Sequence, residues 1–213
     1  GRVDADLFDA VIRAHTVVVR APLAPELRLH LLTEDCPLWR ANEAQAAAAG
    51  LVDPWWAFCW PGGQALARYV LDHPATVRGK RVLDFGSGGA VEALAALRAG
   101  AASAVAVDVD PFASAAARLN AELNALPLGT ETRDLIGCAI DADVVLAGDV
   151  FYEKDLGARA LRWLRSAGVP VLIGDPSRGF LEAGGLDRLA TYLAHADGDT
   201  SGAALRETHV YRL

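Results

Sequence analysis

The stretch Arg81–Gly89, with the sequence RVLDFGSGG, constrains the fold of this chain more than any other. An apolar run rich in strand formers carries Asp84 near its end, and a glycine cluster and a helix-favouring segment, 90–98, follow it. Glycines after a strand let the backbone turn sharply and approach a ligand, and the next helix points unpaired N–H groups at that ligand. A second apolar run, 104–108, ends in Asp108. Strand, glycine turn, helix, strand and acid together predict half of a nucleoside-cofactor site.

Length, charge and cysteine content limit the possible functions. The 213 residues fit one domain, and 20 basic against 27 acidic residues give a net charge of −7. This balance disfavours a nucleic-acid partner, because phosphate contacts need clustered cations. No apolar run approaches the roughly 20 residues that span a bilayer, and no basic-then-apolar signal opens the chain. Cys36, Cys59 and Cys138 form no CxxC pair, so we expect no metal site, reduced thiols and a cytoplasmic location.

The N-terminal third mixes helical and extended patterns before an aromatic segment. We expect helices over 4–14, 38–49 and 65–72, and strands over 16–20 and 27–32. Residues 53–64 hold three of the five tryptophans and end in Pro61-Gly62-Gly63-Gln64. This aromatic density indicates either a pocket wall or a hydrophobic plug under the sheet edge.

From residue 78 onward, strand and helix patterns alternate. The expected strands are 81–85, 104–108, 130–133, 143–147 and 169–173, and the expected helices are 90–99, 111–124 and 153–167. The strands are continuous apolar runs, as in a parallel sheet covered on both faces. We expect a helix after Gly185, a turn at Asp197-Gly198-Asp199 and a final strand at 207–213. The chain therefore predicts a single domain, 1–213, with an N-terminal extension, 1–75, and a Rossmann-like core, 76–213.

The residues around the glycine turn narrow the choice of nucleoside. A dinucleotide site favours G-x-G-x-x-G, but this register gives Gly86, Gly88 and Val91, so the third glycine is missing. An acid at Asp84 can pair with a cationic amine instead. The simpler alternatives are that Asp84 caps the loop and that Asp108 caps the helix from Pro111, a role for which Asp110 competes.

Asp84-Phe85-Gly86-Ser87-Gly88 resembles motif I of the class I, seven-strand S-adenosylmethionine-dependent methyltransferases, with Ala90 in place of the last glycine. The resemblance implies an α/β fold whose Rossmann-like sheet of seven strands is mostly parallel and has an antiparallel C-terminal strand. It also implies that Asp84 lies near the amino end of the methionine, that Asp108 accepts the ribose hydroxyls, and that a short backbone run passes under the cofactor. That run consists of Gly86, Ser87, Gly88 and Gly89. A dinucleotide oxidoreductase remains the outside alternative.

The acceptor side is indicated by Asp149 and Tyr152, which follow the strand at 143–147. Asp149-x-x-Tyr152 resembles the [DE]-x-x-[YF] motif of seven-strand protein lysine methyltransferases, and the Pro-Pro of base-amino methyltransferases is missing here. In this fold the carboxyl ends of the strands carry the chemistry, so Asp149 and Tyr152 would be catalytic and face the transferred methyl. The simpler alternative is a helix cap and a core tyrosine.

The resemblance to the electron transfer flavoprotein β-subunit lysine methyltransferases covers most of the chain, through residues 56–69, 119–124, 148–152, 173–178 and 210–213. It implies that Trp60, Gly63 and Gln64 help to enclose the cofactor and that Asp134 and Leu135 lie near its adenine. Asp175-Pro176-Ser177-Arg178 would shape the path of the protein substrate, unless it is plain loop.

The sequence thus predicts a protein N6-lysine methyltransferase that uses S-adenosylmethionine, returns S-adenosylhomocysteine and acts on electron transfer flavoprotein β. The alternatives are a methyltransferase of a ribosomal protein or small molecule and a non-catalytic S-adenosylmethionine-binding regulatory protein. The Asp149 and Tyr152 pair disfavours the last alternative.

Overall fold

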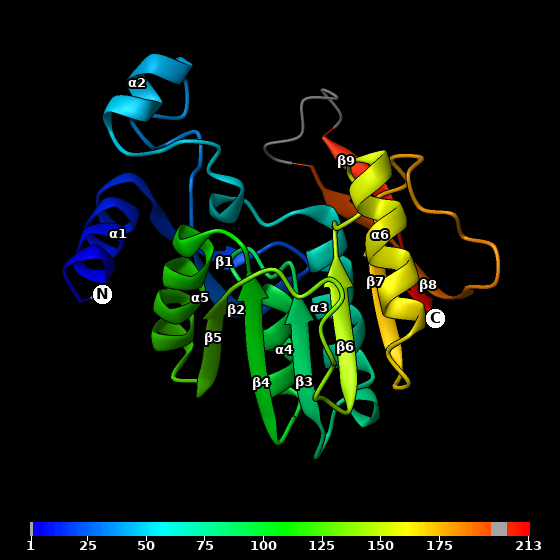
Figure 1. The fold of residues 1–213 in the computed structure, drawn as a ribbon. Coiled ribbons are helices and arrows are strands. Elements are labelled where there is room, and N and C mark those ends of the chain that lie inside the picture. Colours follow the sequence, from blue (N-terminus) through cyan, green and yellow to red (C-terminus); the bar gives the residue numbers. More distant parts are fainter. Residues whose placement is uncertain (1, 197–203) are drawn as a thin grey trace.

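A seven-stranded sheet forms the centre of the molecule (Figure 1). The computed structural model describes residues 2–196 and 204–213, so the turn expected at 197–199 lies outside the described residues. The strand order is β5-β4-β3-β6-β7-β9-β8. β3 to β7 run parallel, whereas β9 is antiparallel to both β7 and β8. The strands are β3 (Arg81–Phe85), β4 (Ser103–Asp108), β5 (Leu128–Thr132), β6 (Val144–Gly148), β7 (Val171–Asp175), β8 (Asp187–His195) and β9 (Leu205–Arg212). The predicted sheet, with its antiparallel C-terminal strand, is confirmed.

Helices cover both faces of this sheet. α3 (Pro61–Asp72), α4 (Val91–Arg98) and α5 (Pro111–Asn124) pack on one face, and α6 (Lys154–Arg165) packs on the other. Figure 1 shows α6 in front of the strands and α3 and α4 behind them. β6 and β7 are buried at every position, which explains why their sequences are apolar throughout.

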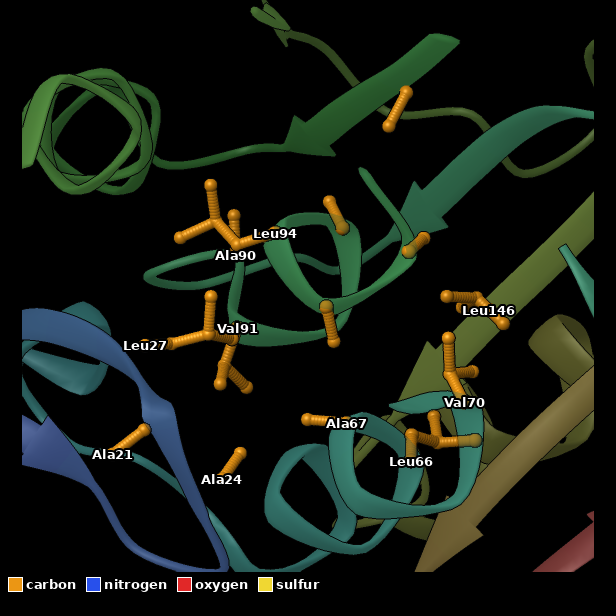
Figure 2. Close-up of a cluster of buried hydrophobic side chains, with 14 of the residues drawn as sticks. Ala21, Ala24, Leu27, Leu66, Ala67, Val70, Ala90, Val91, Leu94 and Leu146 are labelled. Carbon is orange, nitrogen blue, oxygen red and sulfur yellow. The ribbon is translucent and has the colours of Figure 1, made fainter. Parts of the chain in front are cut away.

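The core on the α3 and α4 face joins the sheet to the N-terminal segment. Figure 2 shows Leu66 and Val70 of α3 near Leu146 of β6, with Val91 and Leu94 of α4 beside Leu27. These side chains are almost entirely removed from water. Burial of each large aliphatic side chain contributes about 1.5–3 kcal/mol, so the positions of α3 and α4 are set by apolar packing.

The N-terminal extension consists of α1 (Arg2–His15), the antiparallel hairpin β1 (Val17–Ala21) and β2 (Ala24–Leu31), and α2 (Glu43–Ala48). Short 3-10 turns follow at Trp55–Ala57 and Pro74–Thr76. The helix expected over 38–49 is shorter than predicted. Asn42 and Gln45 form a capping box that starts α2 at Glu43, and Gly50, with φ +83°, ends the segment.

The helix predicted after Gly185 is wrong, because residues 187–195 form β8. The Leu- and Ala-containing sequence of this segment favours a helix locally. β8 instead pairs antiparallel with β9 along its whole length, from Asp187 opposite Arg212 to His195 opposite Leu205. The backbone hydrogen bonds of this long-range pairing override the weak local preference.

No helix among the described residues has the length and the apolar character needed to cross a bilayer. Nor do those residues bring together three or more His, Cys, Asp or Glu side chains in an arrangement that could hold a metal ion.

Candidate active site

A cavity of about 570 Å³ opens at the carboxyl ends of β3, β4 and β6. In parallel α/β sheets this edge is where ligands bind. The wall combines the glycine turn after β3, the aromatic segment before α3 and the residues that follow β6. The predicted site residues that line it are Trp60, Gly63, Gly86, Ser87, Gly88, Gly89, Asp108, Asp134, Asp149 and Tyr152. Residues far apart in the sequence therefore share one cavity.

The glycine turn has a backbone that most side chains disfavour. Gly86 and Gly88 have φ values of +65° and +50°, and a Cβ on Gly86 would lie 2.9 Å from Val150 Cγ1. Ala90, at the start of α4, also takes a left-handed conformation, with φ +66°. Such a conformation costs an L residue roughly 1–2 kcal/mol. This cost explains why glycine is usual at that position and shows that this chain reaches the same turn with alanine.

Asp108 holds the glycine turn and faces the cavity. Its Oδ2 accepts a hydrogen bond from the N–H of Gly88 at 2.9 Å, and its Oδ1 accepts one from the N–H of Asp110 at 3.0 Å. Asp110, not Asp108, caps α5, because the Asp110 side chain accepts from the N–H of Phe112. The capping alternative for Asp108 therefore falls away, and its carboxylate is directed by the turn toward the cavity.

Ser87 supplies a polar atom that the protein itself leaves unsatisfied. Its side chain is only 6 % exposed and lines the cavity, yet Oγ has no hydrogen-bond partner. A buried hydroxyl without a partner costs about 1–3 kcal/mol. A ligand with polar groups over the turn would recover that energy, so this wall fits a polar nucleoside cofactor.

Asp84 does not line the cavity. It is fully buried, and its Oδ2 accepts from the N–H of Ala93 at 3.2 Å. Burial raises the pKa of Asp84 to about 7, against the lowering effects of the Ala93 hydrogen bond and of a hydrogen bond with Glu92. The sequence predicted a direct contact of Asp84 with the cofactor amine, and here Asp84 lies behind the wall.

Glu92 is the acid that reaches the cavity near Asp84, and sequence reasoning missed it. It is 3 % exposed, and burial together with the charge of Asp84 raises its pKa well above the usual range. Its only sequence signal is an acid in the first turn of the helix after the glycine turn, a position that the helix dipole favours in any protein.

Asp149, which directly follows β6, caps the N-terminus of α3. Its Oδ1 and Oδ2 accept from the N–H groups of Gly62 and Gly63, each at 2.8 Å, while Trp60, the N-cap residue, makes no side-chain cap. Burial raises the pKa of Asp149 to about 6, although these two bonds and the positive charge of Arg178 act to lower it. Asp149 therefore does cap a helix, as the simpler alternative held. The same carboxylate also lines the cavity.

Tyr152 is not a core tyrosine. Its side chain is 60 % exposed at the rim of the cavity, where it follows Asp149 by three residues. Partial desolvation, followed by the charge of Asp108, raises the pKa of its hydroxyl, so the phenol stays neutral at physiological pH.

The aromatic segment serves both as a plug and as a pocket wall. Trp56 is buried and stacks on Phe112 with ring centroids 5.7 Å apart, and it also lines the cavity, as Trp60 does. The Nε1 of Trp60 donates to the Trp55 carbonyl at 2.8 Å, and the guanidinium carbon of Arg178 lies 5.9 Å from the Trp60 ring centroid. The loop after β7 thereby meets the aromatic segment over the cavity.

Besides Asp84, two more residues predicted to contact the cofactor, Gln64 and Leu135, do not line the cavity. Gln64 is fully buried away from the cavity, where its Nε2 donates to the carbonyls of Cys59 and His195 and its Oε1 accepts from the N–H of His195. Gln64 thus fastens α3 to β8. Leu135 is buried in the core under α6. Its neighbour Asp134 does line the cavity, and its Oδ1 accepts from the N–H of Ile136.

The fold and site define a class I S-adenosylmethionine-dependent methyltransferase. The family model for ribosomal protein L11 methyltransferase (PrmA) matches residues 64–149. The fold resembles that of magnesium protoporphyrin IX methyltransferase from Synechocystis PCC 6803, solved with bound SAM, with a TM-score of 0.52 and 19 % identity over 71 % of this chain and 80 % of that one.

Two relatives are named electron transfer flavoprotein beta subunit lysine methyltransferase. The Xenopus laevis protein is 44 % identical over 83 % of this chain and 73 % of its own length. The Danio rerio protein is 40 % identical over 89 % of this chain and 75 % of its own length. The chain belongs to the electron transfer flavoprotein beta subunit lysine methyltransferase family.

Proposed function

We propose that this protein transfers a methyl group from S-adenosylmethionine to the Nζ of a lysine on the electron transfer flavoprotein β subunit. The observation that carries the proposal is the single cavity shared by the glycine turn, Asp108 and Asp149. Family membership supports the substrate, since relatives at 40–44 % identity carry that substrate in their names.

We propose that the donor half of the cavity holds the cofactor along its length. We assign the adenine to the side of Asp134, the ribose hydroxyls to Asp108 and the amino-acid end to the turn 86–89. The unsatisfied Ser87 Oγ supports this placement, because it offers a hydrogen bond where the turn passes under the ligand. When bound, S-adenosylmethionine supplies an electrophilic methyl on a sulfonium.

The acceptor half must receive a neutral amine. A lysine has a pKa of about 10.4, so at pH 7 only about one in a few thousand is neutral, and reaching that form costs about 4–5 kcal/mol. The amine lone pair then forms the N–C bond as the C–S bond breaks and its electrons stay on sulfur. The proton leaves to water. The protein contributes mainly proximity and orientation to this in-line displacement.

Asp149 and Tyr152 are proposed to orient the amine. Each carboxylate oxygen of Asp149 accepts one backbone N–H and keeps a second lone pair for the substrate amine. Because α3 holds the carboxylate rigidly, little reorganisation accompanies reaction. The Tyr152 ring lines the same wall and offers a π-face to the growing ammonium charge.

The test is methyl transfer from labelled cofactor to purified electron transfer flavoprotein, with the label mapped by mass spectrometry. We expect label on lysine of the β subunit. Label on arginine, on a terminus or on small molecules alone would contradict the proposal. Asp149→Asn should lower transfer by about 100-fold or more while S-adenosylhomocysteine affinity stays within about three-fold. The matched control is Glu153→Gln, which alters the cap of α6 outside the cavity and should leave transfer unchanged.

Ribosomal protein L11 belongs in the same assay as a second candidate substrate. The family model named for its methyltransferase covers residues 64–149, which include the whole glycine turn and end at Asp149. This match supports the cofactor half more than the acceptor half. Transfer to L11 at a higher kcat/KM than to electron transfer flavoprotein would replace the proposed substrate.

We further propose that the protein works in the cytoplasm without nucleic acid, membrane or metal. The net charge of −7 supports the first exclusion. Cys36, Cys59 and Cys138 form no disulfide with one another, which fits a reducing compartment.

A further inference from the structure

Glu92 occupies the position in the cavity wall that Asp84 was expected to fill. Asp84 ends behind the wall, with one oxygen bonded to the N–H of Ala93. Glu92, in the first turn of α4, extends to the cavity instead. Each acid acts on the pKa of the other, so the two carboxyl groups are neighbours, and only Glu92 lines the cavity.

Three elements enclose the Glu92 carboxyl. A Cβ added to Gly148, at the end of β6, would lie 2.1 Å from Glu92 Oε1, and one added to Gly63, in the first turn of α3, would lie 3.0 Å from it. The carboxyl therefore fills the space that these glycines leave open. Its side chain comes from α4, so its place depends on the mutual packing of α3, α4 and β6.

Glu92 is surrounded by like charge. The charged side chains that act on it are the carboxylates of Asp84 and Asp149, and both disfavour its ionised form. Asp108 acts in the same sense on Asp84, while the positive charge of Arg178 acts on Asp149. A buried carboxyl with acidic neighbours is costly unless a cation pairs with it.

A second observation points to a ligand at the same wall. Ser87 Oγ is buried, lines the cavity and has no partner, so the wall is built for a polar group that the protein does not supply. Of the polar ends of the proposed cofactor, the one that carries positive charge beside the turn is the α-amino group.

We propose that the carboxylate of Glu92 binds the α-amino group of S-adenosylmethionine and S-adenosylhomocysteine, with Asp84 supporting it from behind. This inference rests on the proposed function only for the identity of the cofactor. On binding, the ammonium would displace the proton that the acid pair holds, and that proton would pass to solvent.

The test compares two ligands that differ in the amino-acid end. S-adenosylhomocysteine carries the amino group, whereas 5′-methylthioadenosine keeps the adenosine and the sulfur and lacks the amino acid. Glu92→Gln preserves shape and keeps an N–H donor toward Asp84. By calorimetry we expect E92Q to weaken S-adenosylhomocysteine by about 10- to 100-fold, the loss of one charged hydrogen bond, and 5′-methylthioadenosine by less than about three-fold.

Asp134→Asn is the matched control, because Asp134 lies on the proposed adenine side. It should weaken both ligands by the same factor. Equal weakening of both ligands by E92Q, or of neither, would overturn the role of Glu92. If E92Q does not fold, judged by thermal unfolding, Glu92→Asp takes its place. It draws the carboxylate back by one methylene and should show the same selective loss. A wild-type protein that binds neither ligand would instead contradict the proposed cofactor.

Discussion

Gly88 in the donor half of the cavity and Gly62 and Gly174 in the acceptor half are glycine for different reasons. In the turn after β3, Gly88 has φ +50° and a Cβ there would meet nothing within 4 Å, so only the backbone conformation requires glycine. In the acceptor half, a Cβ on Gly62 would lie 2.2 Å from the carbonyl oxygen of Gly174, and one on Gly174 would lie 2.1 Å from that of Gly62. Here glycine permits α3 to approach β7. The first use is local and leaves a motif, and the second depends on a contact between residues more than 100 positions apart.

Gly174→Ala should produce the largest effect, because the added methyl meets backbone that cannot move alone. We expect a loss of more than about 4 kcal/mol in the free energy of unfolding, measured with urea. Gly184→Ala is the matched control, since a Cβ there meets nothing within 4 Å, and it should change stability by less than about 0.5 kcal/mol. A G174A protein within 1 kcal/mol of wild type would show that α3 and β7 do not need this close approach.

The buried acids of the two halves should differ in how they make the free energy of unfolding depend on pH. Asp84 has a folded pKa of about 7 against 3.8 when unfolded, so the folded state binds the proton more tightly. The stability that it contributes is present below about pH 4 and is lost as pH rises through 7. Relative to Asp84→Asn, wild type should lose up to about 4 kcal/mol over that window.

Asp149 provides the comparison for this measurement. Its folded pKa is about 6, so the stability that it contributes is lost about one pH unit lower than that of Asp84. Urea midpoints for D84N, D149N and wild type, collected from pH 4.5 to 8, separate the two. A wild-type protein that gained stability over D84N with rising pH would contradict the sign.

Asn120 should carry the link between the donor half and the N-terminal extension. It is fully buried, accepts from the N–H of His30 in β2 at 2.8 Å and donates to the carbonyl of Gly89 at 2.9 Å. Asn120→Ala leaves both groups unsatisfied and should cost about 2–3 kcal/mol in thermal or urea unfolding. Asn124→Ala removes the corresponding, exposed bonds to Arg28 and should cost less than about 1 kcal/mol. The single domain 1–213 stays a prediction, and equal losses in the two variants would argue against it.

The smallest effect is expected at Arg178. Its positive charge lowers the pKa of Asp149. Arg178→Gln should therefore raise that pKa and move the acid limb of the kcat/KM profile to higher pH, by less than about one unit. Arg178→Lys keeps the charge and should restore most of the profile. An acid limb that moves to lower pH in R178Q would contradict the assignment.

The sequence predicted those features that depend on residues close together in the chain, and it missed those that depend on distant residues. The turn from Asp84 to Ala90 and the acid at Asp108 depend on local backbone preference and on one neighbouring strand, so they were predictable. Asp149 was placed at the right sheet edge for the same reason. β8 was not predictable, because its partner β9 lies in a separate segment and its own residues favour a helix.

Side-chain direction was the second limit. The strand pattern placed Asp84 at the cofactor edge, but alternation and the packing of α4 put its carboxyl behind the wall and Glu92 in front. Gln64 was assigned to the cofactor by resemblance, and its side chain meets the backbone of His195, 131 residues away. β7 also begins two residues later than predicted, after Pro170, which carries Asp175 into the strand.

Asp149 combines a structural role, the capping of α3, with a proposed role in methyl transfer, and in most proteins different residues serve these two purposes. Because its carboxylate closes the N-terminus of α3, a descendant that abandoned methyl transfer would still need this residue to keep its fold. The retention of the acid in a relative is therefore poor proof that the relative is an enzyme. For the same reason, the presence of Asp149 in this chain is weaker evidence against a non-catalytic protein. Tyr152, exposed at the rim, carries no such structural duty. On the proposed role of Tyr152 in orienting the amine, its loss would be the earlier sign that a lineage has given up catalysis.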